Sequence, residues 1–164
     1  MSLLSLVMIV RDEAEALPSF LAEHARLADQ TVVVDTGSTD DSLGIARRAG
    51  CVTTRHRWRD DFAAARNAGL DLARASWVLI MDADERLGAA QQRALRRHLR
   101  TARPAVFVQP TLNYCPAGSH LEWQPVTGRF PDLERGHAGY FRARRAGLFP
   151  NRPDLRFGGR VHET

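Results

Sequence analysis

The chain has 164 residues, of which 44% are hydrophobic and 26% charged, and a formal net charge of +4. This length and composition allow one globular domain and exclude a disordered or fibrous chain, and no apolar run approaches the roughly 18–20 residues of a membrane-spanning helix. All 23 basic side chains are arginines, which excludes lysine Schiff-base chemistry and a lysine-dependent phosphate loop. We expect a cytoplasmic protein whose basic charge suits phosphate-rich ligands or the inner face of a membrane.

The first hundred residues alternate short apolar runs with segments of helical periodicity. This alternation is typical of an α/β protein, and it predicts an open, mostly parallel sheet of core order 3-2-1-4 with helices on both faces. We expect strands at 5–10, 31–35, 51–55 and 77–81, and helices at 16–28, 39–49, 60–74 and 87–100.

The character of the chain changes after Pro104, where glycine, proline, aromatic residues and arginine dominate. Two strands are expected there, at 106–108 and 140–144, within antiparallel strands and loops that lack helical periodicity. The sequence therefore predicts a single domain over 1–164, with 1–103 as a nucleotide-binding half and 104–164 as a partial acceptor-binding and metal-closing part.

Acidic residues follow the ends of four predicted strands. Open α/β sheets bind ligands at the carboxyl ends of their strands, so these acids are expected along one edge. Helix capping explains acids at the same places, and for residues 12, 13, 40 and 41 we weigh the two explanations equally. The strand-end acids are Asp12, Glu13, Asp35, Asp60, Asp61, Asp82 and Asp84.

The strongest chemical motif is Asp82-Ala83-Asp84, which directly follows a buried strand. Side chains two residues apart in an extended chain lie on the same side, so both carboxylates can face one cation. Mg²⁺ or Mn²⁺ prefers one or two carboxylates together with substrate phosphate oxygens. A divalent metal site is therefore expected here.

Two further residues suit a nucleotide. Asp35 ends a strand and precedes Gly37, so its carboxylate could accept hydrogen bonds from a base or a ribose. A tight turn with a Ser or Thr cap explains the same residues. Arg66 lies on an alanine-rich helix and could reach a phosphate as a fixed cation, although a solvated helix arginine is the commoner case.

Four blocks in this order, at residues 10–13, 34–40, 58–67 and 81–85, resemble the family-2 inverting glycosyltransferases. The similarity is strongest to the bacterial branch that includes lipopolysaccharide-core glycosyltransferases and glycosyltransferases carrying tetratricopeptide repeats. Residues 157–163 resemble the closing motif of that branch, which ends in Val-His-Glu. Catalytic domains of this kind continue beyond that motif, so the chain is expected to be a fragment, a truncated relative or an obligate oligomer.

The resemblance implies a GT-A-like fold and assigns roles on the donor side. It places Asp35 at the nucleotide base or ribose and Arg66 at the donor. The backbone around Val10 and Arg11 would line the nucleoside pocket.

The resemblance also implies the groups around the reacting centre. Asp84 is the firmer ligand for Mn²⁺ or Mg²⁺, and Asp82 contacts the metal or the ribose. His162 is a candidate third metal ligand, and Glu163 a candidate general base for the acceptor hydroxyl.

The expected function is metal-assisted transfer of a sugar from a nucleotide-sugar donor to a carbohydrate or lipid-linked acceptor, with inversion. Peripheral membrane contact and a homo-oligomer are further expectations, and no specific nucleic acid is expected. One alternative is a truncated or non-catalytic module that binds nucleotides or polyanions. Another is a sugar-nucleotide nucleotidyltransferase, although the loop after the first strand is acidic and lacks the glycines that such enzymes need.

Overall fold

The computed structural model describes residues 2–160. Within them the chain forms two compact units, one made of residues 2–106 and 147–160 and the other of residues 107–146. The hydrogen-bonded strand order is β3-β2-β1-β4-β7-β5, with β6 paired to β7.

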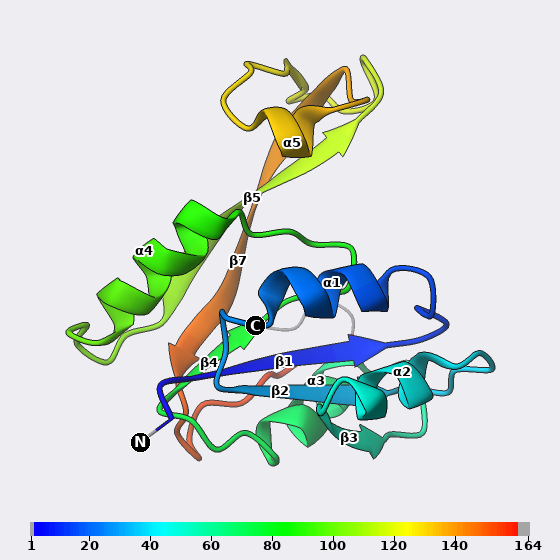
Figure 1. Ribbon diagram of the computed structural model, residues 1–164, viewed down its shortest axis with the longest axis vertical. Helices are drawn as coiled ribbons and strands as arrows, with labels where there is room; N and C mark the ends of the chain where they lie inside the picture. Colours follow the sequence, from blue (N-terminus) through cyan, green and yellow to red (C-terminus); the bar gives the residue numbers. More distant parts are fainter. Residues whose placement is uncertain (1, 161–164) are drawn as a thin grey trace. The chain divides into compact units, whose positions relative to one another are not determined.

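The sheet of the first unit confirms the predicted core order 3-2-1-4 (Figure 1). β1 lies between β2 and β4 and runs parallel to both, and β3 runs parallel to β2. The end of β7 adds an antiparallel strand beside β4. The strands are β1 (Leu4–Val10), β2 (Gln30–Asp35), β3 (Val52–Arg55), β4 (Trp77–Ile80) and β7 (Gly139–Pro150).

The four predicted helices are present, but each is shorter than its periodic pattern. Turns replace their last residues: the amide of Leu27 donates to the carbonyl of His24, and that of Leu72 to Gly69. Gly50, with φ +79°, follows the second helix at the left-handed position that suits glycine. The helices are α1 (Leu17–His24), α2 (Ser42–Arg48), α3 (Phe62–Leu70) and α4 (Ala89–Leu99).

Helices cover both faces of this sheet. On one face Val7, Val32 and Ile80 pack with Leu70 of α3. The alternate side chains of β1 point to the opposite face, where α1 contributes the fully buried Phe20 and α2 packs against α1. β1, β2 and β4 are mostly continuous apolar runs because both of their faces are covered.

The second unit contains β5 (Phe107–Cys115), β6 (Gln124–Pro125), the short helix α5 (Pro131–Glu134) and the first part of β7. β6 pairs antiparallel with β7, as expected for this region. Both long strands extend well beyond their predicted cores. α5 was not predicted, because four residues are too few to show a helical period.

Gly69 sets how closely α3 approaches the sheet. A Cβ atom at this position would lie 2.5 Å from Val7 Cγ1 and 3.0 Å from Val34 Cγ2. We therefore expect Gly69→Ala to lower the free energy of unfolding by about 1–3 kcal/mol through overpacking, despite the better helix propensity of alanine. Urea denaturation measures the change, and a variant as stable as the wild type would contradict the close packing.

Candidate functional site

Sheet topology brings the predicted acids to one edge. Asp35 is the last residue of β2 and lies in register with Val10, the last residue of β1. Asp82 follows β4, in which Ile80 is in register with Val7. Because β1 separates β2 from β4, the two acids lie about 10 Å apart across the sheet, which is two strand spacings.

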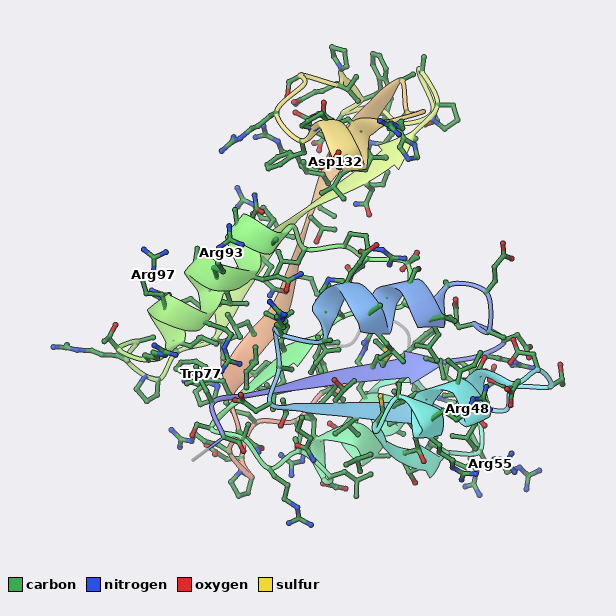
Figure 2. All side chains as sticks on the ribbon, in the orientation of Figure 1. Arg48, Arg55, Trp77, Arg93, Arg97 and Asp132 are labelled. Atoms are coloured by element: carbon green, nitrogen blue, oxygen red, sulfur yellow. The ribbon has the colours of Figure 1, made fainter. Side chains whose placement is uncertain are left out.

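Asp35 is a buried carboxylate, with 1% of its surface exposed. Its Oδ1 accepts hydrogen bonds from the amides of Gly37 (3.3 Å) and Ser38 (2.8 Å). Its Oδ2 lies 3.4 Å from Nε of Arg55, whose side chain is 74% exposed and projects at the end of β3 (Figure 2). A hollow of about 310 Å³ opens here, lined by Asp35, Gly37, Ser38, Arg55, His56 and Arg57.

The loops after β1 and β2 are tied to each other. Asp12, in the left-handed region at φ 55°, accepts hydrogen bonds through Oδ1 from the amides of Thr39 (2.6 Å) and Asp40 (3.3 Å). The bond from the Thr39 amide is the main cause that lowers the pKa of Asp12. The carbonyl of Val10 accepts from both the amide and the hydroxyl of Thr36. These hydrogen bonds therefore hold the two loops together, and their groups are already paired within the protein. The neighbouring Arg11 is exposed.

The loop after β4 presents its two acids differently. The amide of Asp82 donates to Glu85 Oε2 (2.9 Å), and the amide of Glu85 donates to the carbonyl of Asp82 (3.0 Å). Arg66 on α3 is 6% exposed, and its Nη1 lies 3.4 Å from Asp82 Oδ1. Asp84 is exposed at the edge. The buried guanidinium of Arg66 thus orients Asp82, whereas Asp84 faces solvent.

Glu13 adds a third acid near this loop. Its partial burial, and then repulsion from Asp84, Asp40 and Asp82, raise the pKa of Glu13. Within residues 2–160 no three His, Cys, Asp or Glu side chains are grouped so that they could hold a metal ion. The acids at this edge therefore fit a cation that is shared with ligand oxygens better than one held by protein groups alone.

α1 holds the same loop from behind. The Nε of Arg86 lies 3.1 Å from Glu23 Oε2, and its Nη1 donates to the carbonyls of Ala83 (2.8 Å) and Glu85 (2.9 Å). The amide of Leu87 donates to Nε2 of His24 at 3.2 Å. The loop that carries Asp82 and Asp84 is therefore fixed to a helix more than sixty residues earlier in the chain.

The last described residues lie along α3. The side chain of Asn67 pairs with the backbone of Phe157 through two hydrogen bonds of 3.0 Å, and the amide of Phe62 donates to the carbonyl of Arg160 at 3.0 Å. Phe62 is the first residue of α3, and α3 begins beyond the carboxyl end of β3. The chain therefore reaches the sheet's carboxyl edge at Arg160, and the predicted His162 and Glu163 lie outside the described residues.

Several contacting residues were not predicted as part of the site. Arg55 stands at the end of a strand, as Asp35 does, and that position was a usable signal. No comparable signal marks Arg86, His24 or Asn67, whose partners are distant in sequence. None of the helices found in residues 2–160 has the length and apolar character to cross a membrane.

His24 predicts a pH dependence of stability. Its Nδ1 pairs with the carbonyl of Phe20 (2.8 Å) and its Nε2 accepts from Leu87, so the ring is held neutral. Burial lowers the pKa of His24 below its ordinary value near 6.5. As the pH falls below about 6.5, the unfolded chain takes up the proton first, so stability present above this pH is lost.

We therefore expect the wild type to lose more stability than His24→Gln when urea denaturation is compared at pH 7.5 and pH 5.5. The variant keeps every carboxylate, so the difference between the two losses isolates the imidazole. Equal losses would show that His24 does not titrate differently on folding.

Comparison with known proteins identifies relatives of this chain. A TPR repeat-containing protein of Synechococcus elongatus is 37% identical over 163 residues, which are 99% of this chain and 35% of that protein. An uncharacterized glycosyltransferase of Rickettsia felis is 28% identical over 92 residues, which are 56% of this chain and 32% of that protein. The matched part of the chain thus covers about a third of the length of each relative.

A solved glycosyltransferase structure is also similar to this chain. A mannosyltransferase from Pyrobaculum calidifontis, in complex with GDP-Man and Mn²⁺, is 25% identical with a TM-score of 0.51, and the match covers 65% of this chain and 34% of that one. The open sheet is therefore that of the GT-A glycosyltransferases. The family model described as glycosyl transferase family 2 matches residues 5–160, and the chain belongs to this family.

Proposed function

We propose that this chain binds the nucleotide-sugar donor in an inverting glycosyl transfer to an acceptor hydroxyl, assisted by Mn²⁺ or Mg²⁺. One observation carries the proposal: a buried carboxylate at the end of β2 and an acidic loop after β4 lie on the same edge, with only β1 between them. The spacing of about 10 Å allows a nucleoside at one acid and a diphosphate at the other.

Asp35 is the nucleoside-binding group in this proposal. Its carboxylate lines the 310 Å³ hollow, where it can accept hydrogen bonds from a base N–H or a ribose hydroxyl. The backbone of Val10 and Arg11, in the neighbouring strand and loop, borders the nucleoside. Arg55 already pairs with Asp35, and as an exposed side chain it can move aside at small cost.

Asp84 and Asp82 are the metal-binding groups. Two carboxylates, with a third that repels them, concentrate negative charge that a cation would relieve. When bound, the cation supplies charge neutralisation for the departing diphosphate. Arg66 lies beside Asp82, and in this role it orients the carboxylate and contributes fixed positive charge toward the donor.

The acceptor side is assigned to residues 104–164. His162 is proposed as a third metal ligand and Glu163 as the base that takes the proton from the acceptor hydroxyl. The contact between Arg160 and Phe62 supports this assignment, because it leads the chain to the edge where Asp84 lies. A carbohydrate or lipid-linked acceptor, reached at the cytoplasmic face of a membrane, completes the proposal.

The nucleoside assignment is tested with Asp35→Ala. Its loss leaves donors of the ligand and of the turn unpaired, so affinity for a nucleoside diphosphate should fall by about 1–3 kcal/mol. Isothermal calorimetry with UDP, GDP and dTDP measures the change. Asp41→Ala is the control, because Asp41 pairs with Arg48 on the surface and does not line the hollow. Unchanged affinity in folded Asp35→Ala would contradict the assignment.

The metal assignment is tested with Asp84→Asn. We expect Mn²⁺ to strengthen binding of a nucleoside diphosphate to the wild type about tenfold or more, and to have a much smaller effect on the variant, because Asp84→Asn removes the firmer of the two proposed carboxylate ligands. Affinity measured with EDTA should be the same for both. Asp132→Asn is the control, since Asp132 is an exposed acid of the second unit (Figure 2). Wild-type binding that ignores the chelator would sink the assignment.

A further inference from the structure

The guanidinium of Arg86 is bonded through all three of its nitrogens to groups from two parts of the chain. Nη1 donates to the carbonyls of Ala83 and Glu85 within the acidic loop. Nη2 donates to the hydroxyl of Ser19 (3.1 Å), and Nε pairs with Glu23. Both of these partners belong to α1. One side chain therefore joins the acidic loop to the helix.

The group also rests on a rigid support. Its Cζ lies 5.7 Å from the ring centroid of Phe20, which is fully buried and stacks on His24 with centroids 4.3 Å apart. His24 in turn accepts the amide of Leu87. The loop is thus held to α1 at two successive residues, Arg86 and Leu87.

One of the two bonded carbonyls, that of Ala83, lies between the proposed metal-binding residues Asp82 and Asp84. The carbonyl of Ala83 belongs to the peptide that links Ala83 to Asp84, and Ala83 itself is 2% exposed. Fixing this peptide limits the directions available to the carboxylates on either side of it. Arg66 fixes Asp82 from the other face of the sheet, whereas the side chain of Asp84 is exposed.

We propose that Arg86, seated on Ser19 and Glu23 of α1, is a positioning residue that holds Asp82 and Asp84 in the geometry needed for a divalent cation. This inference rests on the proposed function, because it assumes that the two acids bind the cation. Arginine suits the task since its planar fork donates in several fixed directions, whereas lysine is a flexible point charge. Groups that orient metal ligands from behind commonly change metal affinity 10–100-fold when they are lost.

Electrostatics alone predicts that removing Arg86 strengthens cation binding, whereas a positioning role predicts that it weakens binding. Arg86 carries a positive charge close to the acids, so its removal should by Coulomb's law strengthen the binding of a cation. If positioning is the larger effect, removal weakens binding instead. The sign of the change therefore separates a positioning role from a mere change of charge.

The first measurement is hydrogen exchange on the metal-free chain, comparing wild type, Arg86→Met and Arg93→Met. Arg93 is an exposed arginine of α4 (Figure 2), and it serves as the matched control. We expect the amides of Glu85 and Leu87 to exchange at least about tenfold faster in Arg86→Met, the scale of a lost hydrogen bond, and to be unchanged in the control. Equal exchange in all three proteins would show that Arg86 does not hold the loop to α1 and would overturn the inference.

The second measurement counts free Mn²⁺ by electron paramagnetic resonance in the presence of GDP or UDP. Arg86→Met should bind Mn²⁺ about tenfold more weakly, while its nucleotide affinity in EDTA stays at the wild-type value. Arg86→Lys keeps the charge without the fork and should not restore binding. Glu23→Gln, which leaves the arginine in place and disturbs folding least, should weaken Mn²⁺ binding in the same direction by a smaller factor.

The outcomes separate this inference from the proposed function. Wild-type protein that takes up no Mn²⁺ with either nucleotide overturns the proposed function and this role with it. Normal uptake by the wild type, together with equal or tighter uptake by Arg86→Met, overturns the positioning role alone. Full restoration by Arg86→Lys would show that a single ammonium group holds the loop as well as the guanidinium fork, and it would overturn the role assigned to the fork.

Discussion

The parallel ladder of β2, β1 and β4 is the constraint on which the site depends. Asp35 and the loop of Asp82 and Asp84 are separated by more than forty residues, and only the register of these strands brings them to one edge. Since side chains alternate between faces, a slip of one residue would turn each strand's side chains to the opposite face. Within the apolar runs a slip would exchange one apolar side chain for another. At the strand ends it would move charged residues such as Asp35 out of place, so these residues fix the register.

Burying charge at this edge is costly, and the surroundings show how the cost is offset. Asp35 accepts hydrogen bonds from two backbone amides and pairs with Arg55. Arg66 pairs with Asp82, and its Cζ lies 5.9 Å from the ring centroid of Phe157. An unpaired charge in either place would destabilise the fold strongly. One partner of each pair is exposed, Arg55 beside Asp35 and Asp82 beside Arg66. A ligand can therefore reach Asp82 directly, whereas it reaches the buried Asp35 only when Arg55 moves aside.

β1, β2 and β4 were predictable because each is a largely apolar run followed or ended by a charged residue, and the order 3-2-1-4 follows from the short connections of an α/β sheet. Helix ends were predicted less well. The periodicity continues into the turns after α1 and α3, where Leu27 and Leu72 remain apolar but close i+3 hydrogen bonds. The length of β7 depends on pairing with β4 in one unit and β6 in the other, and nothing local in the sequence indicates it.

The residues of the site can likewise be separated into those that the sequence predicts and those that it does not. Asp35, Asp82 and Asp84 are visible in the sequence because sheet geometry alone decides where a residue at the end of a strand lies. Their supports are not, because the partners of Arg86 lie on a helix more than sixty residues away and were selected by the packing of α1 against the loop. A strand-end acid can therefore be inferred from a pattern, whereas the groups that hold it in place can be found only once the helices are docked.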